Sequence, residues 1–181
     1  MLAKNIGQSC RLATVRARPG NPRQGFLSIG GRVFPCALGR GGIRAMKREG
    51  DGATPMAAMR VLEGYWRGDR ARRPNSALGF RIIHAEDGWC DAPSDPNYNR
   101  PVQLPYPASH EHMHRHDRLY DHVIVLDWNY GRRMRGAGSA IFLHVAKPGL
   151  QPTEGCIAVD PRTMRMILPL LSKRTVIRVV G

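Results

Sequence analysis

The chain has 181 residues, which is enough for one well-buried core and too few for two ordinary domains. Hydrophobic residues make up 42% of it, a globular value that excludes disorder over most of the length. Its 28 lysines and arginines against 14 acidic residues give a net charge of +14, which favours anionic partners such as nucleic acid, anionic lipid or acidic wall polymer.

The first 24 residues are basic and rich in loop formers, and they predict a flexible leader before a single domain over residues 25–181. Two strands are expected around the Gly30-Gly31 turn, within residues 26–38. Glycine-rich turns follow at 39–42 and 48–55, and strands are expected over 60–67 and 79–85, on either side of an arginine-rich loop at 67–73. Residues 91–107 contain so many prolines that they predict a long surface loop.

The second half is more clearly patterned. Strands are expected over 118–128, 139–146, 155–159 and 175–180, with a basic loop at 131–138. Residues 160–173 predict a helix that Asp160 caps, that begins at Pro161 and that Pro169 shortens or kinks. Its apolar face comprises Met164, Ile167, Leu168 and Leu171. Many short strands with one or two short helices indicate a mainly β fold, either a barrel or a sandwich.

Four cysteines lie far apart and form no CxxC pair, which argues against a zinc ribbon, a thioredoxin-type site or a disulfide-dense scaffold. They are Cys10, Cys36, Cys90 and Cys156. No apolar run approaches the ~18 residues of a membrane span. The basic N-terminus also lacks the apolar centre of a signal peptide. The sequence as written therefore predicts neither a transmembrane segment nor an export signal.

Reactive residue types concentrate near one cysteine. His144 lies late in one expected strand, and Cys156 follows Gly155 at the start of the next. Two adjacent antiparallel strands could place the imidazole beside the thiol, where a paired histidine would lower the thiol pKa. Gly155 would let the backbone turn so that nearby N–H groups face a developing oxyanion. On spacing alone, a cysteine in an apolar strand is more often a small buried hydrophobe.

Several ordered blocks resemble the L,D-transpeptidase (YkuD-type) family, whose members carry a strand histidine before a Ser/Thr-His-Gly-Cys block. Here these are His144 and the run Thr153-Glu154-Gly155-Cys156-Ile157. The glycine-rich segments 36–43 and 47–55 and the strands 118–129 and 136–144 are similar to one branch of the family. Glu154 replaces the usual histidine, Ala158 stands where many members have an arginine, and the His-to-Cys spacing is short.

The resemblance implies an L,D-transpeptidase-like fold and a cysteine acyltransferase that builds cell-wall peptidoglycan and so maintains cell shape. Cys156 would attack the stem tetrapeptide at the bond before the terminal D-alanine, with His144 as base and with oxyanion donors around Gly155. An acceptor amine would resolve the thioester into a 3→3 cross-link. The family uses no metal or cofactor, its partners are peptidoglycan stem peptides, and its location is the cell envelope or periplasm. Residues that could line the cleft and bind substrate are Thr153, Tyr120, Asn129 and Ser139.

Two other functions remain open from the sequence. One is an L,D-carboxypeptidase or amide hydrolase at the same site. The other is a non-catalytic module whose basic face holds anionic cell-wall polymer or nucleic acid, for which the basic clusters are Arg67, Arg70, Arg72 and Arg73, and Arg132, Arg133 and Arg135. No recognition helix, zinc finger or RNP-like aromatic pair indicates a specific nucleic-acid partner.

A run of alternate histidines, His110, His112, His114 and His116, could bind zinc or nickel or could be an exposed polar loop.

Overall fold

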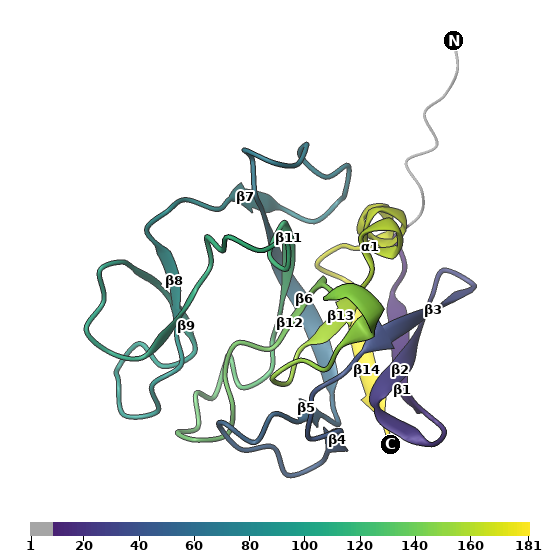
Figure 1. Ribbon diagram of the computed structural model, residues 1–181, viewed down its shortest axis with the longest axis horizontal. Coiled ribbons are helices and arrows are strands. Elements are labelled where there is room, and N and C mark those ends of the chain that lie inside the picture. The colour runs from purple at the N-terminus through teal and green to yellow at the C-terminus, as the bar shows by residue number, and fades with distance from the viewer. Residues whose placement is uncertain (1–8) are drawn as a thin grey trace.

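Eight strands close into a barrel in the computed structural model, which describes residues 9–181 (Figure 1). Their order is β11-β12-β13-β3-β2-β1-β14-β6, and pairing of β6 with β11 completes the ring. The strands are β1 (Leu12–Arg18), β2 (Asn21–Ile29), β3 (Arg32–Ala37), β6 (Ala58–Trp66), β11 (His122–Leu126), β12 (Phe142–Val145), β13 (Ile157–Val159) and β14 (Val176–Val180). β7 (Phe80–Ile82) pairs with the outer part of β6. The expected mainly β fold is confirmed as a barrel.

The barrel interior is filled by alternate residues of all eight strands, as the two-residue period of a strand requires. In β12, for example, Leu143 and Val145 belong to this interior, whereas Phe142 belongs to a different cluster on the outer face. The position of His144 in this alternation therefore places its side chain outside the barrel wall.

The predicted helix closes one end of the barrel. α1 (Pro161–Ile167) is capped by Asp160, whose side chain accepts hydrogen bonds from the N–H groups of Arg162 and Thr163. The chain then tightens into the 3₁₀ helix η2 (Leu168–Leu170) around Pro169. All four residues of the predicted apolar face are buried, so the helix, its cap and its early end are confirmed.

β1 lies inside the segment that the sequence assigned to a flexible leader, and that part of the expectation is wrong. β1 pairs with β14 and β2, and Ala13 and Val15 are fully buried in the barrel. The alternation is hard to recognise in the sequence because the apolar Leu12 is exposed and the buried Ala13 and Val15 are small. Residues 1–8 of the expected leader lie outside the described residues.

A three-stranded sheet, of order β10-β8-β9, covers the outer face of β11 and β12. It consists of β8 (Asp87–Cys90), β9 (Arg100–Gln103) and β10 (His110–His112). Trp89 of β8 meets Phe142 of β12 edge to face, with ring centroids 5.2 Å apart. β9 lies in the proline-rich stretch predicted to be a loop, and that prediction is wrong there. Pro101 is tolerated because β9 is an edge strand, which leaves some N–H groups without a ladder partner.

Two short strands, β4 (Ile43–Arg44) and β5 (Thr54–Pro55), pair in parallel and close the base of the turn between them. A single 3₁₀ turn, η1 (Pro148–Leu150), lies in the connection between β12 and β13. Among residues 9–181, no helix is long and apolar enough to cross a membrane.

Candidate active site

The side chains of His144 and Cys156 lie on the same, outer face of the barrel and line one pocket of about 360 Å³. β12 and β13 are parallel, with Leu143 opposite Ile157 and His144 opposite Ala158, so the expected antiparallel pairing is wrong. The connection over residues 146–156 is a crossover of about the length that parallel strands require. Side chains alternate between the two faces of a strand whether it runs parallel or antiparallel to its neighbour, so the thiol and the imidazole still lie on the same face.

The Cys156 thiol is held by two backbone groups. Its Sγ–H donates to the carbonyl oxygen of Ala140 at 3.2 Å, and Sγ accepts from the N–H of Phe142 at 3.3 Å. Burial raises the pKa of Cys156 to about 12, although the Phe142 N–H partly opposes this. The resting thiol is therefore protonated, and the expected lowering of its pKa by the histidine is wrong for the resting state.

His144 is buried and neutral. Burial lowers the pKa of its imidazole to about 4, against a hydrogen bond to the backbone of Val145 that raises it. Nδ1 lies 2.8 Å from the Val145 carbonyl oxygen, which can only accept, so Nδ1 carries the hydrogen. The lone pair of the neutral ring is consequently on Nε2. The ring also meets Tyr120 edge to face, at a centroid distance of 5.4 Å, and this contact helps to fix its orientation.

Gly155 makes the sharp turn that presents Cys156. Its φ is +136°, and a side chain there would bring a Cβ within 2.9 Å of the Ala53 carbonyl oxygen. Thr153 Oγ1 accepts from the Gly155 N–H at 3.2 Å and donates to the Cys156 carbonyl oxygen at 2.7 Å. The Gly155 N–H is thus already engaged within the turn and does not point free into the pocket.

Three of the four predicted substrate-binding residues line the pocket, namely Thr153, Tyr120 and Ser139. Asn129 does not, and its placement in the cleft is wrong. Its side-chain amide donates to the carbonyl oxygens of Met134 and Gly138, so it holds the basic loop after β11 in shape.

The sequence did not reveal the charged wall of the pocket. Four carboxylates and two cations line it: Glu49, Asp91, Glu111, Glu154, Arg115 and Lys147. Glu49 accepts hydrogen bonds from Ser139 Oγ, at 2.8 Å, and from the Tyr98 hydroxyl. Glu111 and Arg115 lie within the histidine run, where the sequence drew attention to the histidines and not to these two residues. Only the Glu-Gly-Asp-Gly turn gave a usable signal, through its resemblance to the family.

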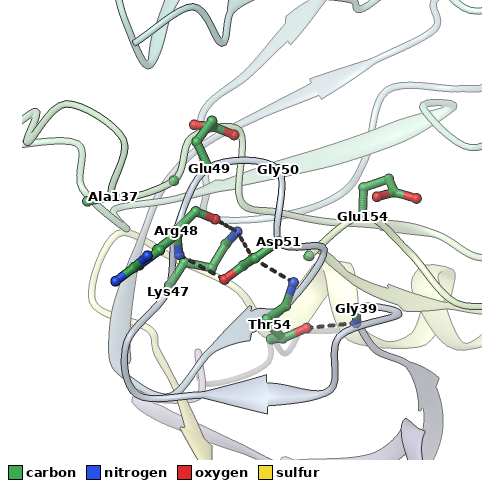
Figure 2. Close-up of polar contacts among 12 residues, drawn as sticks. Gly39, Lys47, Arg48, Glu49, Gly50, Asp51, Thr54, Ala137 and Glu154 are labelled. Carbon is green, nitrogen blue, oxygen red and sulfur yellow. Dashed lines mark hydrogen bonds and ion pairs between the residues drawn. The ribbon is translucent and has the colours of Figure 1, made fainter.

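A buried ion pair shapes the turn that carries Glu49 (Figure 2). Lys47 Nζ lies 2.6 Å from Asp51 Oδ1, and the two side chains are only 2% and 13% exposed. Asp51 also accepts from the N–H groups of Arg48 and Ala53. Burial raises the pKa of Asp51, but these bonds outweigh it and hold the pKa below its usual value. Because Ala53 abuts Gly155, this pair supports the turn beside the nucleophile.

The two departures from the family pattern have separate structural settings. Glu154 is exposed and pairs with Arg40 at 2.7 Å, at the rim of the pocket. Ala158 is fully buried in β13, where it pairs with Ala37 of β3 on one side and with His144 of β12 on the other. Figure 2 shows Glu49 and Glu154 on either side of Gly50, and all three residues line the pocket.

The remaining sequence candidates do not join this site. His110 and His112 lie on β10 with their rings 5.0 Å apart. Within residues 9–181 there is no group of three or more His, Cys, Asp or Glu side chains that could hold a metal ion. All four cysteines are free thiols.

Barrel and pocket together define a β-barrel domain in which a thiol and an imidazole line one pocket on the outer face, under a small second sheet. Residues 20–179 match the model of the L,D-transpeptidase catalytic domain family (YkuD), and the chain belongs to that family. Members of the family are typically cysteine enzymes that act on cell-wall peptidoglycan, which places their work in the cell envelope.

Among solved structures, the chain is similar to L,D-transpeptidase 1 of Mycobacterium tuberculosis, at 13% identity and a TM-score of 0.43. The match covers 97% of this chain and 63% of that one, so this chain spans less than two thirds of its length. A comparison with curated protein sequences gave no match.

Proposed function

We propose that the protein is a peptidoglycan L,D-transpeptidase with Cys156 as nucleophile and His144 as general base. The observation that carries this proposal is that both side chains line one open pocket, with the imidazole in the tautomer that leaves Nε2 able to accept a proton. Membership of the L,D-transpeptidase catalytic domain family supports the same reaction class.

In the first step, Sγ of Cys156 attacks the carbonyl carbon of the third residue of a stem tetrapeptide, and its proton passes to Nε2 of His144. Burial disfavours a standing thiolate–imidazolium pair, so the proton moves as the C–S bond forms. The oxyanion is stabilised by the N–H of Cys156, since the Gly155 N–H is engaged by Thr153. Collapse of the tetrahedral intermediate breaks the C–N bond, and the His144 proton leaves with the D-alanine amine.

In the second step, a side-chain amine of another stem peptide attacks the thioester carbonyl. Its proton returns through His144 to the sulfur, the C–S bond breaks, and a 3→3 cross-link forms. Water in place of the amine gives the L,D-carboxypeptidase reaction. Neither step uses a metal or cofactor, the substrate is peptidoglycan, and the site of action is the cell envelope. Thr153, Tyr120 and Ser139 are the proposed substrate contacts.

Mass spectrometry after exposure to a carbapenem tests the nucleophile, because this β-lactam class acylates the family's cysteine. We expect one covalent adduct on wild-type protein and none on Cys156→Ala. Cys10→Ser is the matched control, since Cys10 is partly exposed and is the thiol most open to non-specific acylation. An adduct that survives Cys156→Ala, or that disappears with Cys10→Ser, contradicts the assignment.

Incubation with a disaccharide-tetrapeptide distinguishes the reactions. A cross-linked dimer supports the transpeptidase, and a tripeptide product identifies the carboxypeptidase. If neither product forms and the protein binds wall sacculi unmodified, the non-catalytic binding module is the correct function.

A further inference from the structure

A second pocket, of about 470 Å³, lies where three separate segments of the chain meet. They are the loop between β6 and β7, the residues that lead into β11, and α1 with the turn after it; β7, β11 and α1 lie in the upper half of Figure 1. Five arginines line this pocket, and Asp121 is its one acidic lining residue. The arginines are Arg70, Arg72, Arg73, Arg118 and Arg165.

The loop that supplies most of this charge is fixed in place. Arg67 is buried, forms two hydrogen bonds with Asp69, and donates to the Arg115 carbonyl oxygen. Arg70 donates to the carbonyl oxygen of Asp117 at 3.0 Å. Two arginines of the predicted basic cluster are therefore structural supports, and they hold the loop that carries Arg72 and Arg73 at the pocket.

The other arginines are not neutralised within the protein. Asp121 lies 3.6 Å from Arg70 and 3.5 Å from Arg118, so it compensates part of the charge of those two. Arg72, Arg73 and Arg165 are exposed, and across residues 9–181 none of their guanidinium groups forms a hydrogen bond or ion pair. Burial, together with the nearby Arg165, lowers the pKa of His122 in the same wall, so His122 remains neutral near neutral pH although Asp121 opposes this.

From this convergence we propose that the pocket is a binding site for a phosphate or diphosphate group, separate from the Cys156 cleft. Arginine forks match the oxygens of a tetrahedral oxyanion, and several of them can bind one phosphoryl group. A ligand with a single carboxylate would leave most of the positive charge of these arginines uncompensated. A phosphomonoester carries about two negative charges and a diphosphate carries more, so either compensates it better. No Phe, Tyr or Trp side chain lines the pocket to stack a base, which favours a phosphate group over single-stranded nucleic acid.

Titration of the full chain with inorganic pyrophosphate, followed by calorimetry, tests the site. We expect binding at one site per chain, with an affinity at least tenfold weaker in the variant Arg72→Gln/Arg73→Gln/Arg165→Gln. The matched control is Arg32→Gln/Arg132→Gln/Arg135→Gln, which removes three exposed arginines outside this pocket and changes the net charge equally. The control should bind as wild type does.

Equal weakening in both variants would mean that only the net charge attracts the ion, and the proposal would be wrong. It would also be wrong if pyrophosphate did not bind while a short DNA duplex did. The Cys156→Ala variant should bind pyrophosphate with unchanged affinity. This makes the result independent of whether the cleft is catalytic.

Discussion

The two pockets of the barrel treat charge in opposite ways. In the Cys156 cleft the reactive groups are buried and neutral, and Lys47 and Asp51, in the turn beside it, are paired at 2.6 Å. In the arginine pocket most of the arginines are exposed, and the Arg118 side chain is 78% exposed. The guanidinium groups of Arg72, Arg73 and Arg165 have no partner among the described residues. A buried ionisable group must be paired or become neutral, whereas water solvates an exposed charge, which therefore remains available to bind a ligand.

The comparison separates the overall charge of the protein from its chemistry. The whole chain has a net charge of +14, whereas the cleft is lined by four carboxylates and two cations. The proposed reaction therefore depends on a few fixed dipoles and one proton acceptor, and the excess charge is available for attraction of anions.

Replacement of His144 by Gln should have the largest effect. The amide cannot accept the thiol proton, so carbapenem acylation of Cys156 should slow by roughly 10²–10⁴-fold. Stopped-flow or mass-spectrometric rates would measure this, and pyrophosphate binding at the arginine pocket should not change. An acylation rate within a few-fold of wild type would remove His144 from the mechanism.

Loss of one partner of the buried ion pair should come next. Lys47→Met leaves the Asp51 carboxylate buried without its cation, which should lower the free energy of unfolding by about 3–5 kcal/mol. Denaturant unfolding measures the change. The control is Arg40→Met, which breaks an equally short pair whose side chains are 54% and 75% exposed, and it should cost less than about 1 kcal/mol. Similar costs for the two variants would contradict the contrast between buried and exposed charges.

The sequence predicted the barrel better than the cleft because a strand can be recognised from the local alternation of apolar and polar residues. β6, β11, β12 and β14 and the capped helix α1 were all expected close to where they lie. β1 was missed because its pattern is weak: its largest apolar residue, Leu12, is exposed, and its fully buried residues Ala13 and Val15 are small. β9 was missed because Pro101 is tolerated only at an edge that the sequence cannot identify.

The cleft was predictable where the chemistry is local and missed where it is tertiary. His144, Cys156, Thr153 and the Gly155 turn follow from short motifs. Glu111 and Arg115 enter the pocket because β10 pairs with β8, a contact between distant segments. The resting pKa of Cys156 depends on burial, which spacing does not reveal.

The buried imidazole should also leave a signature in stability. His144 titrates at about 4 in the folded state and near 6.5 when unfolded, so the unfolded chain binds more protons between these values. Its contribution is fully present above pH 6.5 and is lost as the pH falls towards 4, by about 3 kcal/mol in total. Unfolding of wild type and His144→Gln across this window isolates the effect, and parallel pH curves for the two proteins would contradict it.

The smallest expected effect is the sharpest test of the comparison. Arg72→Gln/Arg73→Gln/Arg165→Gln removes three positive charges, yet none of the three lines the Cys156 cleft. Because the resting thiol and imidazole are both neutral, exposed charge outside the cleft, which salt screens, has little to act on there. We expect the carbapenem acylation rate at physiological salt to stay within about twofold of wild type. A large fall in that rate would show that the arginine pocket is coupled to the cleft, and that one substrate could occupy both.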